Sequence, residues 1–524
     1  MAARPSSRRA RRALGWVVLG FAVAAVQAVW SLSIPLMAAP DEPSHVVYAA
    51  AVARGEWSGT LGAAPSDGSA PGAATTVELP SDYAAAILLP NCFAFHPDAP
   101  ASCQQALPAP NGGSVAVKTF AGQYPPLYYL AVGWPSRFLS AGPSTVAMRL
   151  LSALISAALL TWGLFRLRTT TLARPWIWGT LAAVTPMTLF LGATVNPQAL
   201  EISSAFAFWA ACLALARSDD PSGPRGAVAQ AAVTGALLVN ARTSGPVWAL
   251  TIMVVALVIA PQGRLRLLWR LRAMRWALGA AVVSGLLAAA WLITHGAVVS
   301  GDHQYPGYSR PLTVAHVVLL NSYAYLRQMI GDYGWLDAPS PTLTLVVWIG
   351  LLAALIIAAF VVGRSRRARA ALLLSIVAVV AMPVVLQIPT AVDTGIIWQG
   401  RYTLPLAVGV PMVAAIVLST KPRTLHVPGR RLMPWLVVAA AAGHVAAFWW
   451  AMRRYSVGLT GPLVSWSPAW SPFLGYLGTV SLYAALVIVT LAAARYALRP
   501  TPSAATPSVD PGTFDGQRRL EPLA

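Results

Sequence analysis

Charged side chains are scarce in this sequence. Only 10% of its 524 residues are Asp, Glu, Lys or Arg, whereas 57% are hydrophobic and the mean hydropathy is +0.61. A soluble domain carries about 25% charged residues, so a soluble protein of this length would need many more polar side chains to cover its surface. The composition therefore excludes an ordinary soluble globule and predicts a protein that lies in a bilayer.

Acidic residues and lysine are rarer still. The chain has 17 Asp and Glu against 37 Lys and Arg, and Lys118 and Lys421 are its only lysines. The net charge of +20 could suggest a nucleic-acid partner, but the arginines gather on one side of the predicted topology, as in "RLRLLWRLRAMR" and "RSRRARA". This distribution follows the positive-inside rule, so it predicts cytoplasmic N- and C-termini, contacts with membrane lipids and no nucleic acid. The heavy use of Arg suggests a GC-rich bacterium, and hence a multi-pass protein of a bacterial plasma membrane.

Cysteine is limited to three residues. Cys212 falls in an apolar run, where it acts as a small hydrophobic residue. Cys92 and Cys103 lie eleven residues apart in one predicted outer loop. An oxidising compartment would permit a disulfide between them, with two free thiols as the alternative.

Long apolar runs are abundant in the chain. About 20 apolar residues span a bilayer as a helix, and the sequence therefore predicts an all-α polytopic membrane protein with about twelve transmembrane helices. The predicted spans are 15–37, 146–166, 176–194, 199–216, 227–241, 247–261, 276–298, 342–362, 370–388, 403–420, 432–452 and 473–494. The pair 227–241 and 247–261 is short and could form a re-entrant hairpin. A signal peptide is the alternative for the first run, which is longer than an ordinary signal core.

The predicted organisation has four parts. A basic cytoplasmic N-terminus (1–14) precedes a catalytic transmembrane module (15–420), which includes a long extracytoplasmic loop (38–147). Further transmembrane helices (421–498) and a disordered cytoplasmic tail (499–524) follow. Within the long loop, "SHVVYAAAVARG" predicts a short helix, because Pro43 suits the first helical position and Gly55 suits the end. The stretch "SGTLGAAPSDGSAPGAATT" predicts a mobile segment, and "QYPPLYYLAVGWPSRFL" predicts an interfacial one.

The motif "PDEPSH" opens the long loop with three candidate catalytic residues. Asp41 and Glu42, with His45 close by, could supply a general base for a hydroxyl nucleophile. A helix cap in a solvated acidic loop is the alternative. These side chains could also hold a divalent ion, but no second ligand cluster follows, so no metal is assigned. The sequence has no Walker or dinucleotide glycine motif, and no cofactor is expected.

Other candidate binding residues fall near the same predicted ends of the spans. In "WQGRY", Arg401 could grip a phosphate while Gln399 and Tyr402 add hydrogen bonds, although an arginine snorkelling to headgroups is common. The loop "GDYGWLD" mixes carboxylates and aromatics suited to sugars, or forms a surface loop with an aromatic belt. Its candidates are Asp332, Tyr333, Trp335 and Asp337. Asn196 in "TVNPQALE" could serve the site or only form a turn. Arg242 is a candidate partner for Glu201, at the start of the following span.

Four motifs carry a family resemblance. "PDEPSH", "NPQAL", "YGWLD" and "QGRYTLPL", in this order, resemble an uncharacterised family of bacterial integral-membrane proteins commonly grouped with the GT-C glycosyltransferases. The resemblance runs from Ala38 to Pro411. The chain departs from the family pattern at Gln198, where an Asp commonly follows the Asn-Pro pair.

The resemblance implies a GT-C-like enzyme that transfers a sugar from a polyprenyl-phosphate donor to a glycan or lipid acceptor of the cell envelope. On this basis Asp41 matches the catalytic carboxylate of the long first loop, with Glu42 as its substitute. Arg401 matches a contact to the donor phosphate. The rival functions are a transporter or flippase of lipid-linked saccharides, which twelve spans would also suit, and a non-catalytic envelope assembly protein.

Overall fold

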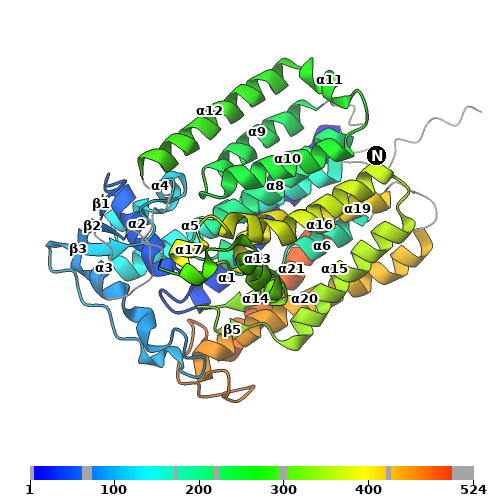
Figure 1. The fold of residues 1–524 in the computed structure, drawn as a ribbon. Helices are drawn as coiled ribbons and strands as arrows, with labels where there is room; N and C mark the ends of the chain where they lie inside the picture. The colour runs from blue at the N-terminus through cyan, green and yellow to red at the C-terminus, as the bar shows by residue number, and fades with distance from the viewer. Residues whose placement is uncertain are drawn as a thin grey trace, which may run out of the picture.

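The computed structural model describes residues 5–61, 74–169, 175–217, 224–295, 304–419 and 426–498. The predicted disordered tail and most of the predicted mobile stretch lie outside these residues. The chain is built mainly of helices, arranged as a bundle with a small sheet at one end (Figure 1).

The longer helices form the bundle. They are α1 (Pro5–Ser33), α5 (Ala141–Thr169), α8 (Gln198–Arg217), α9 (Arg225–Val239), α10 (Gly245–Ile259), α12 (Arg272–Thr294), α15 (Thr342–Val362), α16 (Arg366–Gln387), α19 (Gly409–Ser419), α20 (His426–Val457) and α21 (Gly475–Ala497).

Shorter elements connect them. The α-helices are α2 (Glu42–Ala53), α3 (Ser81–Ala86), α4 (Leu127–Val132), α6 (Pro175–Ala183), α7 (Pro186–Gly192), α11 (Arg264–Trp269), α13 (Pro311–Leu320), α14 (Ser322–Gly331), α17 (Ala391–Thr394) and α18 (Leu404–Ala407). The 3-10 helices are η1 (Leu89–Cys92), η2 (Ala101–Cys103), η3 (Trp134–Arg137), η4 (Pro306–Tyr308) and η5 (Gly400–Thr403).

Within the described ranges, nine helical segments are long and apolar enough to cross a membrane, and each coincides with a predicted span. The other three predicted spans are shorter or broken. The run 176–194 is divided into α6 and α7 at Pro186, where the Thr185 side chain accepts the Thr188 N–H and caps α7. Proline cannot donate the hydrogen bond that would continue α6, so hydropathy alone missed this break. Helices α9 and α10 have 15 residues each.

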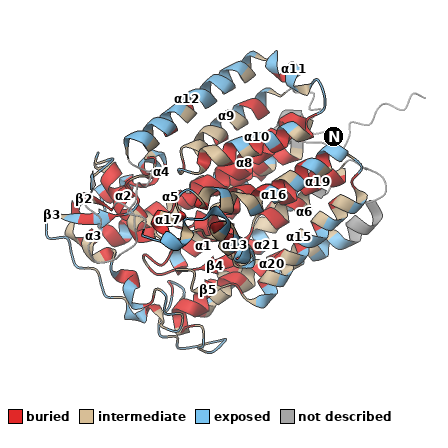
Figure 2. Ribbon diagram, in the orientation of Figure 1, coloured by how far each residue is buried: buried red, intermediate tan, exposed pale blue. Residues whose placement is uncertain are grey.

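Burial divides the bundle into a centre and a periphery. Helix α8 is buried over nearly its whole length, whereas α12 exposes most of its apolar side chains (Figure 2). Exposed leucine and valine on a peripheral helix suit contact with lipid tails, because the apolar surface meets no water there. Four aromatic residues meet in the core around Trp30, namely Phe190, Tyr333, Phe448 and Tyr483.

The long loop contains β-structure that the all-α prediction omitted. Strands β1 (Thr60–Leu61), β2 (Thr75–Pro80) and β3 (Ser114–Thr119) form an antiparallel sheet in that order, with Val77 opposite Val117. Two further short strands, β4 (Asp332–Tyr333) and β5 (Ala338–Pro339), form a hairpin. The alternation in "TTVELP" and "SVAVKT" is the signal for half-buried strands, but each run is only six residues long.

The long loop closes over one end of the bundle, which we call the loop end. The predicted disulfide is confirmed: Cys92 and Cys103 are bonded, with their Cα atoms 6.0 Å apart. The predicted helix after Asp41 is also confirmed as α2, and Gly55 follows it at φ +90°. Figure 1 shows the sheet with α2 and α3 at this end and the N-terminus at the other.

Candidate functional site

Asp41 stands at the start of α2, at the loop end. It is the N-cap residue, at φ 60°, and its side chain makes no capping hydrogen bond. Instead its Oδ2 accepts a hydrogen bond from Nη2 of Arg401 at 2.6 Å. The Asp41 side chain keeps 48% of its surface exposed, against 1% for Arg401. Burial by the surrounding protein acts to raise the pKa of Asp41, but the attraction of the Arg401 guanidinium helps to outweigh it, and the pKa lies below its usual value.

Arg401 is held in place by neutral side chains. Its Nε donates to Oε1 of Gln399 at 2.6 Å, and its Nη1 donates to Oε1 of Gln198 at 2.9 Å. The guanidinium carbon also lies 5.1 Å from the centre of the Tyr402 ring. Two amide groups and a ring fix the orientation of the guanidinium without neutralising it, so Asp41 is the partner that balances its charge.

A second guanidinium, that of Arg242, lies over the same Tyr402 ring at 4.7 Å. Its Nη2 donates to the Tyr124 hydroxyl at 3.3 Å. The predicted partner is confirmed, because Nη1 of Arg242 pairs with Glu201 at 3.5 Å. The loop end thus collects two largely buried cations around one tyrosine, next to the half-exposed carboxylate of Asp41.

Glu42 has a different environment from its neighbour. Its side chain is fully buried and forms a two-pronged ion pair with Arg149, with Nε donating to Oε1 at 2.7 Å and Nη2 donating to Oε2. The backbone N–H of Val195 also donates to Oε1, at 3.1 Å. The remaining donors of Arg149 reach three carbonyls at the end of α1, those of Ser31, Ile34 and Pro35. This arrangement ties α1, α2 and α5 together and leaves the Glu42 carboxylate no open side.

His45 is also buried, on the first turns of α2. Its Nδ1 lies 2.9 Å from the hydroxyl of Tyr129, on α4. Burial lowers the pKa of His45 to about 3, and the charges of Arg242 and Arg401 act in the same direction. At neutral pH the imidazole is therefore uncharged and can exchange only a hydrogen bond with Tyr129.

Asn196 links the segment before α8 to the residues before α2. Its side-chain nitrogen donates to the carbonyl of Pro40 at 3.1 Å, and its oxygen accepts from the N–H of Gln198 at 3.0 Å. The hydroxyl of Tyr128 accepts the backbone N–H of Asn196. Asn196 therefore positions Pro40, and through it the adjacent Asp41. The side-chain oxygen of Gln198 in turn accepts from Nη1 of Arg401.

The loop after α14 separates its four predicted residues. Tyr333 lies in the aromatic core, with its hydroxyl 2.9 Å from that of Ser340. Asp332 is buried beside Arg327 at 3.4 Å, and burial raises its pKa to about 7. Tyr333 and Asp332 thus face protein, where no substrate could touch them without rearrangement of the core.

Asp337 and Trp335 lie closer to the surface. Asp337 pairs with Arg454 at 2.7 Å and accepts the backbone N–H of Trp335 at 3.1 Å, so its carboxylate shapes the turn. Trp335 is partly exposed and borders a cavity next to α2. Of this group, Trp335 is the residue that is accessible at the loop end.

An apolar groove lies beside the site. It has a volume of about 550 Å³ and is lined by α4, α5, α8 and α9, through residues that include Tyr128, Trp162, Leu200 and Leu237. Tyr128 in its wall accepts the backbone N–H of Asn196, whose side chain donates to Pro40 next to Asp41, so the groove wall is linked to the polar site through Asn196. Its lining offers almost no polar atoms, which suits a hydrocarbon chain.

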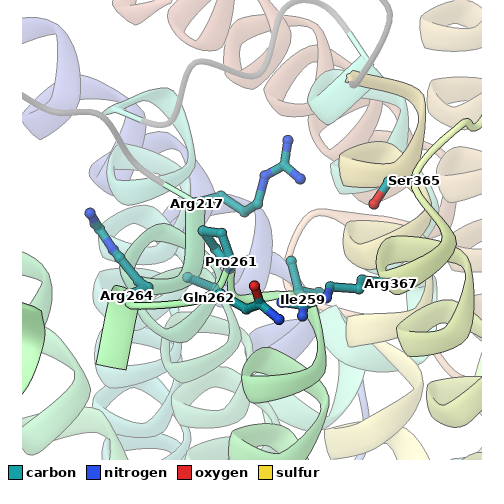
Figure 3. Close-up of a pocket in the computed structure, with 8 residues that line it drawn as sticks. Arg217, Ile259, Pro261, Gln262, Arg264, Ser365 and Arg367 are labelled. Atoms are coloured by element: carbon teal, nitrogen blue, oxygen red, sulfur yellow. The ribbon is translucent and has the colours of Figure 1, made fainter. Parts of the chain in front are cut away.

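Another cavity, of about 600 Å³, is lined by residues that include Arg217, Arg264 and Arg367 (Figure 3). It lies at the opposite end of the bundle. Arg217 in its wall ends α8, whose first residue, Gln198, contacts Arg401. A helix of this length separates the two ends by about 30 Å. Two of the cavity's arginines cap helices there: Arg264 donates to the carbonyl of Leu215, and Arg367 to that of Ala260.

In the part of the chain that the structure describes, no group of three or more His, Cys, Asp and Glu side chains could hold a metal ion.

A family model for a predicted membrane protein, DUF2142, matches residues 25–410. The chain belongs to the DUF2142 family. No curated protein and no solved structure matches it. The DUF2142 match spans Asp41, Asn196, Arg242 and Arg401, so the polar residues brought together at the loop end lie inside the family region.

The sequence missed three side chains of this DUF2142 site. Arg149 lies within the long apolar helix α5. A charge in such a helix requires a partner, and this is the sequence signal that could have identified Arg149. Tyr124 and Tyr129 fall in the segment predicted as interfacial, but contact Arg242 and His45. The segment packs on α2 through one face and exposes apolar side chains such as Leu130 and Trp134 on the other, so the interfacial position stays a prediction.

Proposed function

We propose that this DUF2142 protein is a GT-C-type glycosyltransferase of the bacterial plasma membrane. It transfers a sugar from a polyprenyl-phosphate donor to an envelope glycan or lipid on the extracytoplasmic face. The observation that carries the proposal is the pair of Asp41 and Arg401. A half-exposed carboxylate beside a buried guanidinium, next to an apolar groove, provides a base, a phosphate contact and a site for a lipid chain.

Asp41 acts as the general base in this proposal. An acceptor hydroxyl gives its proton to the Asp41 carboxylate while its oxygen forms a bond to the anomeric carbon of the donor sugar. The bond from that carbon to the phosphate oxygen breaks, and the electron pair leaves with the polyprenyl phosphate. Arg401 and Arg242 stabilise the negative charge on the departing phosphate, since guanidinium groups bind phosphate through paired donors.

Arg401 also links donor binding to the strength of the base. Without donor, its Nη2 donates to Asp41 and lowers the pKa of that carboxyl. A donor phosphate would compete for the same guanidinium, and the released carboxylate would be a stronger base. Glu42, Asn196 and Gln399 position these groups rather than touch the substrate.

The proposal includes a membrane topology. Segments α6 with α7, α9 and α10 also run between the two ends of the bundle, and we propose that they complete twelve membrane crossings. Twelve crossings return the C-terminus to the side of the N-terminus, which the arginine distribution assigns to the cytoplasm. The loop end then faces outward, where the disulfide can form.

Asp41→Asn tests the proposal. In membranes supplied with radiolabelled polyprenyl-phosphate sugars and envelope acceptors, the variant should lose sugar transfer by about a hundredfold or more, because general-base catalysis contributes roughly 10² to 10⁴ in rate. Glu78→Gln, at an exposed carboxylate of the same loop, serves as the matched control and should keep full activity. Unchanged transfer by Asp41→Asn would remove this residue from the mechanism.

The same preparations separate the rival functions. Movement of a labelled lipid-linked saccharide across proteoliposomes, with no new glycosidic bond, would identify a flippase. An assembly protein would keep its cellular role in a triple variant with alanine at Asp41, Glu42 and Arg401, provided that the variant still inserts.

A further inference from the structure

The cavity bordered by Trp335 lies at the loop end, beside the first turn of α2. It has a volume of about 470 Å³. Its walls come from four segments: the start of α2, the disulfide-closed loop, the end of β3 and the turn after β4. Aromatic and polar side chains share the lining, including Phe95, Phe120, Trp335, Asn91, His96 and Lys118.

Phe95 is held in this wall at an energetic cost. Its backbone lies in the left-handed region at φ 63°, which a bulky residue rarely adopts. Its side chain is 68% exposed, so no burial of its ring offsets the strain. The segment is fixed by the Cys92–Cys103 disulfide and by Arg454, whose Nη2 donates to the carbonyl of Phe93 at 2.6 Å. Strain held in place by its surroundings points to a function of the exposed ring.

Trp335 faces Phe95 and is equally well fixed. The two rings meet edge to face with their centres 5.7 Å apart. The indole nitrogen of Trp335 donates to the carbonyl of Met37 at 3.3 Å, and the backbone N–H is held by Asp337. Trp335 and Phe95 thus form a rigid pair of rings, which we call the aromatic corner, and the ring faces that do not touch each other are open to solvent.

The cavity is next to the proposed base. Pro43 and Ser44, in its wall, follow Asp41 and Glu42 directly in the chain. The Thr119 hydroxyl donates to the carbonyl of Ser44 at 2.7 Å and ties this turn to β3. A molecule bound against the aromatic corner would therefore lie beside the first turn of α2, whose N-cap residue is Asp41.

We propose that this cavity binds the acceptor as a saccharide, whose ring stacks on Trp335 and Phe95. Fixed aromatic faces bind the apolar faces of sugar rings, while Asn91, His96 and Lys118 offer hydrogen bonds to hydroxyl groups. The inference rests on the proposed function and refines it: the acceptor is a glycan, and it enters from the disulfide side of α2. A purely lipid acceptor would not form hydrogen bonds with the polar, solvent-exposed lining of this cavity.

Saturation-transfer NMR on the full chain in nanodiscs tests the proposal. The probes are methyl glycosides and short oligosaccharides of glucose, galactose, mannose and arabinose. At least one probe should bind the wild-type protein, and Trp335→Ala and Phe95→Ala should each weaken its binding by about threefold to tenfold. Trp466→Ala and Phe138→Ala, at exposed rings outside the cavity, are the matched controls and should bind as the wild type does.

Two outcomes overturn the inference: no saccharide of the panel binds the wild-type chain, or binding is unaffected by Trp335→Ala and Phe95→Ala. The proposed function is tested separately by Asp41→Asn, which should keep saccharide binding and lose transfer. Binding at the cavity without any transfer from a lipid donor would retain the saccharide site and reject the glycosyltransferase. Transfer with an unchanged acceptor KM in Trp335→Ala and Phe95→Ala would retain the glycosyltransferase and reject the saccharide site.

Discussion

Asp41 and Glu42 are neighbours in the chain, yet their carboxylates meet opposite surroundings. Asp41 is half-exposed and shares a buried guanidinium with two neutral amides. Glu42 is enclosed and paired on both oxygens with Arg149. A buried carboxylate whose two oxygens both accept hydrogen bonds stabilises the fold, whereas an accessible carboxylate can accept a proton. At the scale of single residues, the proposed function therefore gives the acidic pair two roles, with Glu42 as the positioning group and Asp41 as the reactive group.

Removing one partner of the buried pair should destabilise the protein. Arg149→Ala leaves the Glu42 charge buried without its ion pair, so the free energy of unfolding should fall by about 3 to 5 kcal/mol. Replacing both side chains, as in Glu42→Leu with Arg149→Met, should recover part of this loss. Thermal unfolding in detergent measures both effects.

The control for this prediction is Asp41→Asn. Its amide oxygen can still accept from Arg401, so its unfolding should resemble that of the wild type. Equal destabilisation by Asp41→Asn and Arg149→Ala would contradict the division of roles.

The lowered pKa of Asp41 gives a pH prediction with a defined sign. Because the folded state holds the carboxyl ionised below its usual range, the ion pair stabilises the protein above that range. This contribution is lost as the pH falls through the lowered pKa. Arg401→Gln should therefore raise the pKa of Asp41, which infrared difference spectroscopy can follow, with Asp41→Asn to assign the band.

Arg137→Gln is the matched control, since this exposed arginine bonds the carbonyl of Ala53 rather than Asp41. Arg137→Gln should leave the pKa of Asp41 unchanged. A titration that is the same in Arg401→Gln and in the wild type would show that the guanidinium does not set the pKa.

Secondary-structure elements were predictable where local signals define them. Helix α2 begins and ends as Pro43 and Gly55 indicate, and the disulfide follows from two cysteines in one loop. The pairing of Asp41 with Arg401 is different, because no local pattern shows which of 35 arginines meets a given carboxylate. The sheet was missed for a related reason: its strands are short and pair across a long insertion.

One glycine in η5 controls how close two elements approach. A Cβ atom at Gly400 would lie 2.1 Å from the backbone carbonyl oxygen of Tyr325, on α14. Gly400→Ala should therefore push η5 away from α14 and displace Arg401, with a loss of transfer of about a hundredfold, as a shift of 1 Å can cause. Transfer assays with the lipid-linked donor measure it.

Gly279→Ala is the control for this effect, since a Cβ atom there meets no neighbour within 4 Å. It should leave transfer unchanged. Normal activity in Gly400→Ala would mean that the site tolerates movement of η5.

For the whole molecule, the contacts define two unlike ends. The loop end carries the sheet, the disulfide and the Asp41 site, and the other end carries arginines that cap helix termini. Composition and hydropathy predicted the nine long apolar helices and the long loop. The break between α6 and α7 was not predicted, because an averaged hydropathy does not respond to a single proline.

Cysteine labelling should establish the orientation of these ends. The native cysteines give little background, since Cys212 is buried and the other two are bonded to each other. A membrane-impermeant maleimide should label Ser114→Cys in intact cells, because this exposed residue of β3 faces outward in the proposed topology. Gln262→Cys, at the opposite end, should react only after permeabilisation. The reverse pattern would place the proposed site in the cytoplasm.

The separation of 360 positions between Asp41 and Arg401 also sets an order of events during biosynthesis. Ribosomes add about 5 to 20 residues per second, so the carboxylate emerges roughly 20 to 70 seconds before its guanidinium partner. During that interval the nascent chain lacks this ion pair, whatever the insertion machinery has already placed in the bilayer. Under the proposed function, the protein would therefore become competent only after the segment carrying Arg401 is inserted, and a fragment made by a ribosome that stalls earlier would be inert.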